Sequence, residues 1–212
     1  MTPTDPQQAS SKAALTRAAI LRAAGEFFEE NPFRDLTVGG LMRQTGLSRA
    51  TFYLYFNDLH GLLETLLEGV KGGIVEGAHK WLSNEGESIA TLQDSLRALV
   101  DVGHTHGAIL RAVSDGAPTD ARLENVWQSF LASFDEVVSA RIAQDQAKGL
   151  TPEFDPLPVA RTLNRMDAAI LIHAFGSPQK KEKEEVLTAL LRIWLSTLYP
   201  FDAKAALQKE SP

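Results

Sequence analysis

Residues 37–56 read TVGGLMRQTGLSRATFYLYF and contain two short helical segments separated by a turn at Gly46. Thr37 is a suitable N-cap for the first segment, because its hydroxyl can accept a hydrogen bond from a free backbone N–H group. Gly46 can adopt a positive φ and end that segment, and Ser48 can cap the second one. Two short helices joined by a tight, glycine-containing turn predict a helix-turn-helix.

The second segment, RATFYLYF at residues 49–56, is expected to form one helix with a buried and an exposed face. Leu41, Leu47, Phe52 and Phe56 are predicted to point inward. In a helix-turn-helix the second helix enters the DNA major groove by its N-terminal end. We therefore expect DNA contacts from the caps and the outward side chains, which are Thr37, Arg43, Ser48, Arg49, Ala50, Thr51, Tyr53, Leu54, Tyr55 and Asn57.

These side chains suit different parts of a duplex. Arginine pairs with guanine O6 and N7, so Arg49 is expected to read a base, and Ala50 and Leu54 suit a thymine methyl group. Thr51, Tyr53 and Tyr55 are better suited to phosphates, which set the register of the protein on DNA. The alternative is a helical hairpin that does not bind DNA and whose aromatic residues only fill its core. Filling the core is the role that we expect for Phe52 and Phe56.

The remaining sequence predicts further helices and no strand. Apolar residues recur at helical spacing, and the intervening breaks carry glycine, proline or capping residues. Ser10 or Ser11 is expected to cap the first helix. The whole chain is expected to be all-α, with about nine helices at residues 10–31, 38–45, 49–56, 57–82, 88–106, 107–116, 120–148, 156–175 and 181–199. The tail after residue 199 has weak helical character.

Composition restricts the classes of function. The net charge is −6, but residues 1–57 carry +1 and the remainder carries −7, so the acidic excess lies outside the helix-turn-helix. No cysteine is present, which excludes disulfides and thiol chemistry. No signal peptide and no apolar run long enough for a membrane span is visible, so a cytoplasmic protein is expected. His104 and His106 do not share a helix face, and no catalytic spacing is present, so neither an enzyme nor a metal site nor a cofactor is expected.

The sequence ILRAAGEFF, followed by PFRDLTVGGLMRQTGLSRATFYLYFNDLHGLL, resembles the N-terminal domain of TetR-type transcriptional repressors over about residues 14–66. The resemblance implies an all-α homodimer, with a DNA-binding head at residues 1–57 and a ligand-binding and dimerisation domain at residues 58–212. Two positions depart from the family pattern. Leu59 stands where the family has a phosphate-binding lysine, and Gly39 stands where relatives often have a polar contact residue.

The C-terminal part, including LENVWQSFLASFDEVV and ARTLNRMDAAILIHAFG, is similar to the EthR-type subgroup, whose long helices enclose a tunnel for elongated apolar ligands. A stripe of aromatic residues at helical spacing is also common in an ordinary core, so plain packing remains open. The resemblance implies an apolar effector site formed by Leu92, Leu96, Leu99, Gly103, Trp127, Phe130, Leu131, Phe134, Asn164, Asp167, Leu171 and Trp194.

The helices at 156–175 and 181–199 carry apolar residues on more than one face, which predicts packing against a second copy of the chain. The positions that suggest this second face are Leu163, Ile170, Val186, Leu190, Ile193 and Leu198. Together these features predict a homodimeric repressor that a small, largely apolar molecule releases from operator DNA. An activator with the same fold remains open. So does a ligand carrier whose DNA-binding heads have lost function, which Leu59 and the Gly39–Gly40 pair favour.

Overall fold

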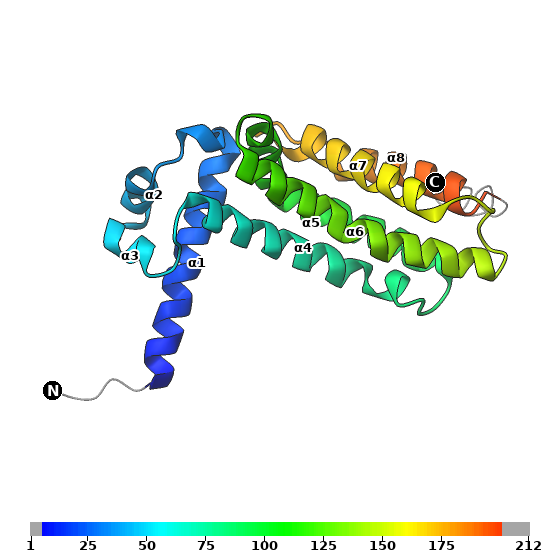
Figure 1. Ribbon diagram of the computed structural model, residues 1–212, viewed down its shortest axis with the longest axis horizontal. Coiled ribbons are helices and arrows are strands. Elements are labelled where there is room, and N and C mark those ends of the chain that lie inside the picture. Colours follow the sequence, from blue (N-terminus) through cyan, green and yellow to red (C-terminus); the bar gives the residue numbers. More distant parts are fainter. Residues whose placement is uncertain (1–5, 201–212) are drawn as a thin grey trace.

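The computed structural model describes residues 6–200, with side chains from residue 11 onward, and this part of the chain is all-α (Figure 1). Its α-helices are α1 (Pro6–Glu30), α2 (Val38–Thr45), α3 (Arg49–Tyr53), α4 (Leu59–Leu82), α5 (Ser88–Gly116), α6 (Ala121–Ala147), α7 (Pro156–Phe175) and α8 (Lys183–Leu198). Two 3-10 turns, Phe33–Asp35 and Ala117–Thr119, precede α2 and α6. The predicted weak helix after residue 199 lies almost wholly outside the described residues.

The helices form a small head and a long bundle. Helices α1, α2 and α3 lie at one end of the molecule, and α4 leads from them along the bundle of α5 to α8 (Figure 1). Helix α5 is the central element of the bundle, because it packs against α4, α6, α7 and α8 and also contacts α1. The head and the bundle are thus joined both by the chain and by packing.

Helix ends follow the predicted capping chemistry. The Thr37 hydroxyl accepts a hydrogen bond from Gly40 N, and the Ser48 hydroxyl accepts one from Thr51 N. Asp58 and Asp120 cap α4 and α6 in the same way. Gly46 has φ 69° and ends α2, which confirms the predicted turn.

Most predicted helix boundaries agree with the structure to within two residues, and three larger differences are found. Helix α1 begins at Pro6 rather than at Ser10 or Ser11. The segments expected at 88–106 and 107–116 form one continuous helix, α5, so the described chain has eight α-helices. The reason is that Gly103 and Gly107 serve close helix packing rather than a break: a Cβ atom at Gly107 would lie 2.6 Å from the backbone of Phe175 in α7. Helix α3 is also shorter than expected.

Candidate DNA-binding head and bundle cavity

The helix-turn-helix is held by the predicted inward residues. Leu41 and Phe52 have no exposed surface and Phe56 is 5% exposed, whereas Leu47 is half-buried and packs against the same core. The rings of Phe52 and Phe56 lie 5.4 Å apart, and the Arg17 guanidinium of α1 lies 5.4 Å from the Phe56 ring. Burying these apolar groups fixes the angle at which α3 leaves the head.

Helix α3 has five residues instead of the expected eight. Beyond Tyr53 the chain tightens, because Tyr55 N and Phe56 N both donate to Phe52 O. The chain must also leave the helix before Asp58, which caps α4. Leu54 and Tyr55 therefore lie in a turn that follows α3, and they are not part of the helix itself.

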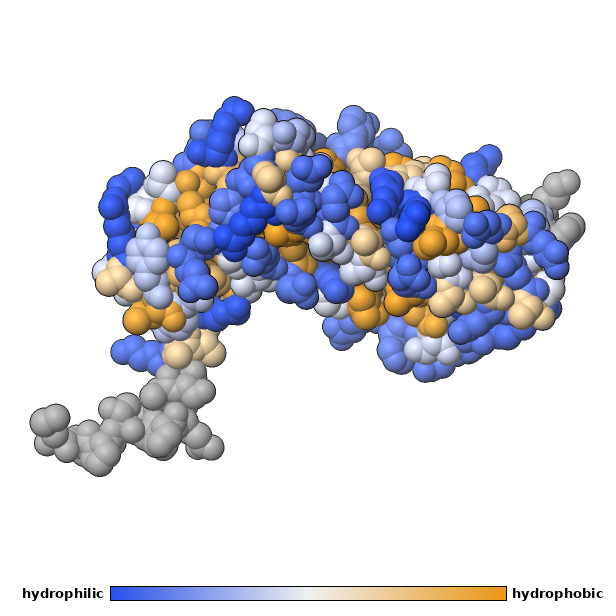
Figure 2. All heavy atoms as spheres, in the orientation of Figure 1, coloured by the Kyte–Doolittle hydropathy of each residue, from blue (hydrophilic) through white to orange (hydrophobic). Residues whose placement is uncertain are grey.

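The outer side of α3 is free of the bundle. Arg49 and Ala50 are exposed, Tyr53 is 59% exposed and Leu54 is 78% exposed, while Thr51 and Tyr55 are half-buried. Hydrophobic residues interrupt the hydrophilic surface over α2 and α3 in Figure 2. These side chains are therefore accessible from outside the single chain.

The other expected DNA-contact residues surround α3. Thr37, Arg43, Ser48 and Asn57 are exposed. No hydrogen bond or ion pair links the guanidinium groups of Arg43 and Arg49 to another residue with described side chains, so both cations are available to an anionic partner. The hydroxyls of Thr37 and Ser48 already accept backbone N–H groups, and the Ser48 hydroxyl also lies 2.9 Å from that of Thr51.

Leu59 is half-buried against the core, at the first position of α4. It packs as an apolar residue and contributes no charge. Leu59 therefore offers no cation at the start of α4, which agrees with the departure noted in the sequence.

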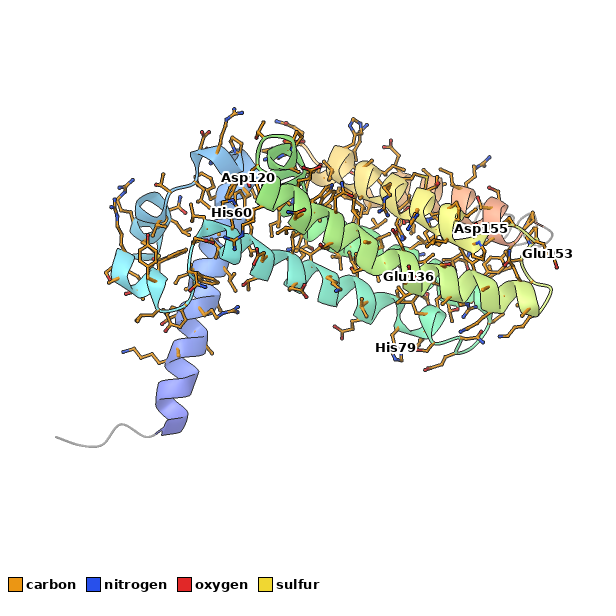
Figure 3. The ribbon with its side chains drawn as sticks, viewed as in Figure 1. His60, His79, Asp120, Glu136, Glu153 and Asp155 are labelled. Atoms are coloured by element: carbon orange, nitrogen blue, oxygen red, sulfur yellow. The ribbon has the colours of Figure 1, made fainter. Side chains whose placement is uncertain are left out.

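Polar contacts join the start of α4 to the start of α6. Arg122 donates to Asp58 Oδ2 at 2.7 Å and to Glu64 Oε1 at 3.1 Å. His60 Nε2 lies 2.7 Å from Asp120 Oδ2, and Figure 3 shows these two side chains facing each other. The backbone N–H of Gly61 lowers the pKa of Asp58, and the hydrogen bond with His60 lowers the pKa of Asp120. These contacts hold the bundle to the part of α4 that adjoins the head.

A cavity of about 90 Å³ lies inside the bundle. It includes ten of the twelve expected effector residues, namely Leu92, Leu96, Leu99, Phe130, Leu131, Phe134, Asn164, Asp167, Leu171 and Trp194. An apolar cavity with few polar groups is the usual form of a small-molecule site.

Two polar side chains of α7 lie in this wall. Asn164 Nδ2 donates to Asp135 Oδ1 at 2.9 Å, and Asp135 also pairs with Arg161 and Arg165. Asp167 is 6% exposed and accepts a hydrogen bond from Trp194 Nε1 at 3.0 Å. Burial raises the pKa of Asp167 to about 7, only partly opposed by that hydrogen bond. Asp167 is thus the ionisable group within the apolar cavity.

Gly103 and Trp127 do not line the cavity, although both were expected to. A Cβ atom at Gly103 would lie 2.6 Å from Leu171 Cδ2, so this glycine serves the close approach of α5 and α7. The Trp127 ring stacks on Phe130, with centroids 5.6 Å apart, and supports the wall from behind.

Helix α4 also contributes to the cavity, which was not predicted from the sequence. Ile74, Val75, Ala78, Trp81 and Leu82 form one side of it. Ile74, Ala78 and Trp81 stand at i, i+4 and i+7, a helical stripe that the sequence contained. The other lining residues that were missed are Ser95, Leu110, Val137, Val138 and Ala168.

A buried polar network surrounds Trp81, one of the residues that line the cavity. Arg141 is 1% exposed and donates to the backbone oxygen of Trp81, to Ser88 Oγ at 2.8 Å and to Asp145 Oδ2 at 3.1 Å. The Tyr199 hydroxyl accepts from Trp81 Nε1 at 3.2 Å and donates to Asp145. Burial raises the pKa of Tyr199 to about 12, which keeps this donor protonated. The network fixes the C-terminal end of α4.

The expected dimer helices bury more of their apolar surface within one chain than the sequence suggested. Leu163, Val186, Leu190 and Leu198 are 0–6% exposed and belong to the bundle core. Fewer apolar residues of α7 and α8 are exposed than the sequence suggested, because both helices pack against α5. Ile193 is 37% exposed, and Ile170 is half-buried.

Comparison with known proteins agrees with this architecture. Residues 20–66 match the family of bacterial regulatory proteins, tetR family, and residues 92–200 match the C-terminal domain of the transcriptional regulator EthR. The chain is a TetR-family regulator of the EthR-like type. It is 28% identical to the HTH-type transcriptional regulator EthR of Mycobacterium tuberculosis, over 85% of this chain and 86% of that protein.

One further relative and one solved structure are similar to most of the chain. The EthR regulator of Mycolicibacterium smegmatis is 26% identical over 86% of this chain and 85% of its own. A TetR-family regulator from Syntrophomonas wolfei has the same fold, with a TM-score of 0.75 and 19% identity over 86% of this chain and 94% of that one. These relatives are transcriptional regulators, so the chain is a DNA-binding regulator and not an enzyme.

The described part of the chain has neither a candidate membrane span nor a cluster of metal-binding side chains. Within residues 6–200, none of the helices combines the length and the apolarity that crossing a bilayer requires. The described side chains also contain no group of three or more histidine, aspartate or glutamate residues that could hold a metal ion.

Proposed function

We propose that the protein is a homodimeric repressor that leaves its operator when a small, largely apolar effector enters the bundle cavity. Residues 1–57 form the DNA-binding head, and residues 58–212 bind the effector and dimerise. The observation that carries this proposal is the position of α4, which contacts the head at one end and lines the cavity at the other.

Helix α4 is suited to transmit movement. Its 24 residues form one uninterrupted helix, about 35 Å long at 1.5 Å per residue. Near its start, Thr65 accepts a hydrogen bond from Arg17 of α1. Near its end, Ile74, Ala78 and Trp81 face the cavity. An effector that displaces the α4 wall therefore also displaces the head.

The cavity must change on binding, because 90 Å³ holds only a few heavy atoms. Regulation requires the effector to bind the released state more tightly than the operator-bound state. A coupling free energy of about 2–3 kcal/mol corresponds to a release of tens- to about a hundred-fold. Widening of the cavity against α4 supplies a physical origin for this difference.

Dimerisation is proposed to use α7 and α8. Ile193 is exposed on α8, and the small residues Ala169 and Ala189 are exposed on α7 and α8. A two-fold dimer presents the same surface from both chains and places two heads on one side of a duplex. The two heads would then read two half-sites of an operator.

The first test is binding to a duplex from upstream of the protein's own gene, measured by fluorescence anisotropy at several salt concentrations. We expect affinity to fall steeply with salt, because binding releases counterions from phosphates. Tyr53→Ala should weaken binding to all duplexes, whereas Arg49→Ala should relax base preference. Adding a medium-chain aliphatic ester should lower operator affinity. Equal affinity of wild type and both variants would refute the proposed docking.

A ligand carrier with inactive heads is the second candidate, favoured by Leu59 in place of a phosphate-binding lysine. The same titration separates the two. A carrier would bind the ester with the same affinity in the presence and absence of duplex, and its duplex binding would show no sequence preference. A repressor would show reciprocal weakening of the two ligands.

A further inference from the structure

Gly39 of α2 lies directly beneath the side chain of Arg49 of α3. A Cβ atom placed on Gly39 would lie 2.3 Å from Arg49 Nη2, and 2.7 Å from both Cζ and Nε. These separations are far below van der Waals contact, so the guanidinium occupies the volume that any other side chain at position 39 would fill. Gly39 is accordingly buried, although Arg49 itself is exposed.

The glycine has no evident local benefit for α2. A glycine inside a helix is about 1 kcal/mol less favourable than alanine. Gly39 has an ordinary helical φ, so its backbone does not require glycine. What the missing side chain provides is the space in which the guanidinium lies.

Packing over Gly39 positions the Arg49 guanidinium, and no ion pair within the described part of the chain neutralises its charge. No carboxylate or backbone oxygen among the described residues binds it, so its five N–H donors remain open to a partner. Long, flexible side chains lose rotamer entropy when they bind, and holding one in place beforehand reduces that loss. Packing on α2 thus restricts Arg49 while leaving its charge and its hydrogen-bonding fork available.

We propose that Gly39 is a positioning residue, whose missing side chain seats the Arg49 guanidinium for contact with the operator. This inference rests on the proposed DNA-binding function. Under this proposal the effects of positions 39 and 49 on DNA binding depend on each other. Any side chain at position 39 displaces the guanidinium from the space that it occupies over Gly39. The cost to folding is small, because the end of a flexible side chain can move away.

A double-mutant cycle tests the proposal, using wild type, Gly39→Ala, Arg49→Ala and the double variant. Operator affinity is measured by anisotropy at fixed salt, on the bound duplex and on a set with single base-pair changes. We expect Gly39→Ala to lower affinity about tenfold, which is 1.4 kcal/mol, and to reduce discrimination at the same base pair as Arg49→Ala. In the Arg49→Ala background, Gly39→Ala should change affinity less than twofold.

Two measurements separate positioning from loss of structure. Gly39→Ala should melt at or above the wild-type temperature, and Gly72→Ala, at an exposed glycine of α4 with open space around it, is the matched control for operator affinity. Without DNA, the NMR signal of the Arg49 Nε–H group should shift in Gly39→Ala and stay unchanged in Gly72→Ala.

Three results would overturn the inference. They are an unshifted Arg49 signal, wild-type operator affinity in Gly39→Ala, and additive effects of the two substitutions. A wild-type protein that binds every duplex equally would instead refute the proposed function, and the inference with it. The Arg49 signal, read without DNA, still shows in that case whether the seat exists.

Discussion

Asp167→Asn is expected to remove a large pH dependence of stability. Asp167 is buried in an apolar cavity, and this burial raises its pKa from the ordinary value of 3.8 to about 7. Between these values the folded chain keeps a proton that the unfolded chain releases. The free energy of unfolding therefore falls as pH rises from about 4 to about 7, by about 1.4 kcal/mol per pH unit. The full loss is on the order of 4 kcal/mol.

Asparagine keeps the shape of the side chain, and its Oδ1 can still accept the hydrogen bond from Trp194 Nε1. The variant lacks the ionisation, so it should gain stability relative to wild type as pH rises. The assay is urea unfolding of both proteins at one protein concentration, at intervals from pH 4.5 to pH 8.5. The stability of Asp167→Asn minus that of wild type should rise by about 2–4 kcal/mol over this range.

A difference that is independent of pH would refute the reasoning, because it would show that Asp167 ionises at its ordinary pKa. Trp194→Phe provides a second check. Removing the indole N–H removes a donor that favours the charged carboxylate, so the fall in stability should extend to higher pH than in wild type.

The remaining predictions concern the bundle network, the cavity and the head. Arg141→Ala leaves Asp145 as an unpaired buried charge and should cost about 3–5 kcal/mol in urea unfolding; a loss below about 1 kcal/mol would show that the network is unimportant. Ala78→Phe fills the cavity from α4 and should lower operator affinity in anisotropy titrations, whereas Ala140→Phe, on the exposed side of α6, should not; equal effects would refute transmission through α4. Leu59→Lys adds a cation at the start of α4 and should make the salt dependence of operator binding steeper by about one phosphate contact; an unchanged slope would show that position 59 does not reach DNA.

Local chemistry explains which parts of the fold could be predicted. Thr37, Gly46 and Ser48 act through hydrogen bonds and backbone conformations within a few residues, so their roles follow from short stretches of sequence. The end of α3 could not be predicted in this way. It depends on where α4 must begin, which is set by packing across the head.

The cavity was predicted less completely, because its wall combines residues of five helices, α4 to α8. The stripes on α5, α6 and α7 were recognised, but Trp127 turned out to lie behind Phe130. A stripe of apolar residues shows which face of a helix is buried. It does not show which of these residues line a cavity and which pack against another side chain. Tertiary contacts also determine which apolar residues of α7 and α8 stay exposed. Leu163 and Leu190, which the sequence suggested for a dimer contact, lie in the core of a single chain.

The contribution of Gly39 could not be read from the sequence. In the sequence it is an unfavourable helix residue, and only the position of the Arg49 side chain in space gives it a role. A contact such as that between Gly39 and Arg49 becomes visible only in the three-dimensional structure.

Footprinting of the operator duplex with dimethyl sulfate, which methylates guanine N7 in the major groove, tests the central claim most directly, since the claim is that two copies of α3 lie in that groove. We expect two protected segments whose centres are separated by about one helical turn or a multiple of it, both lost in Tyr53→Ala. Protection that is absent, confined to one segment, or unchanged in Tyr53→Ala would contradict the account.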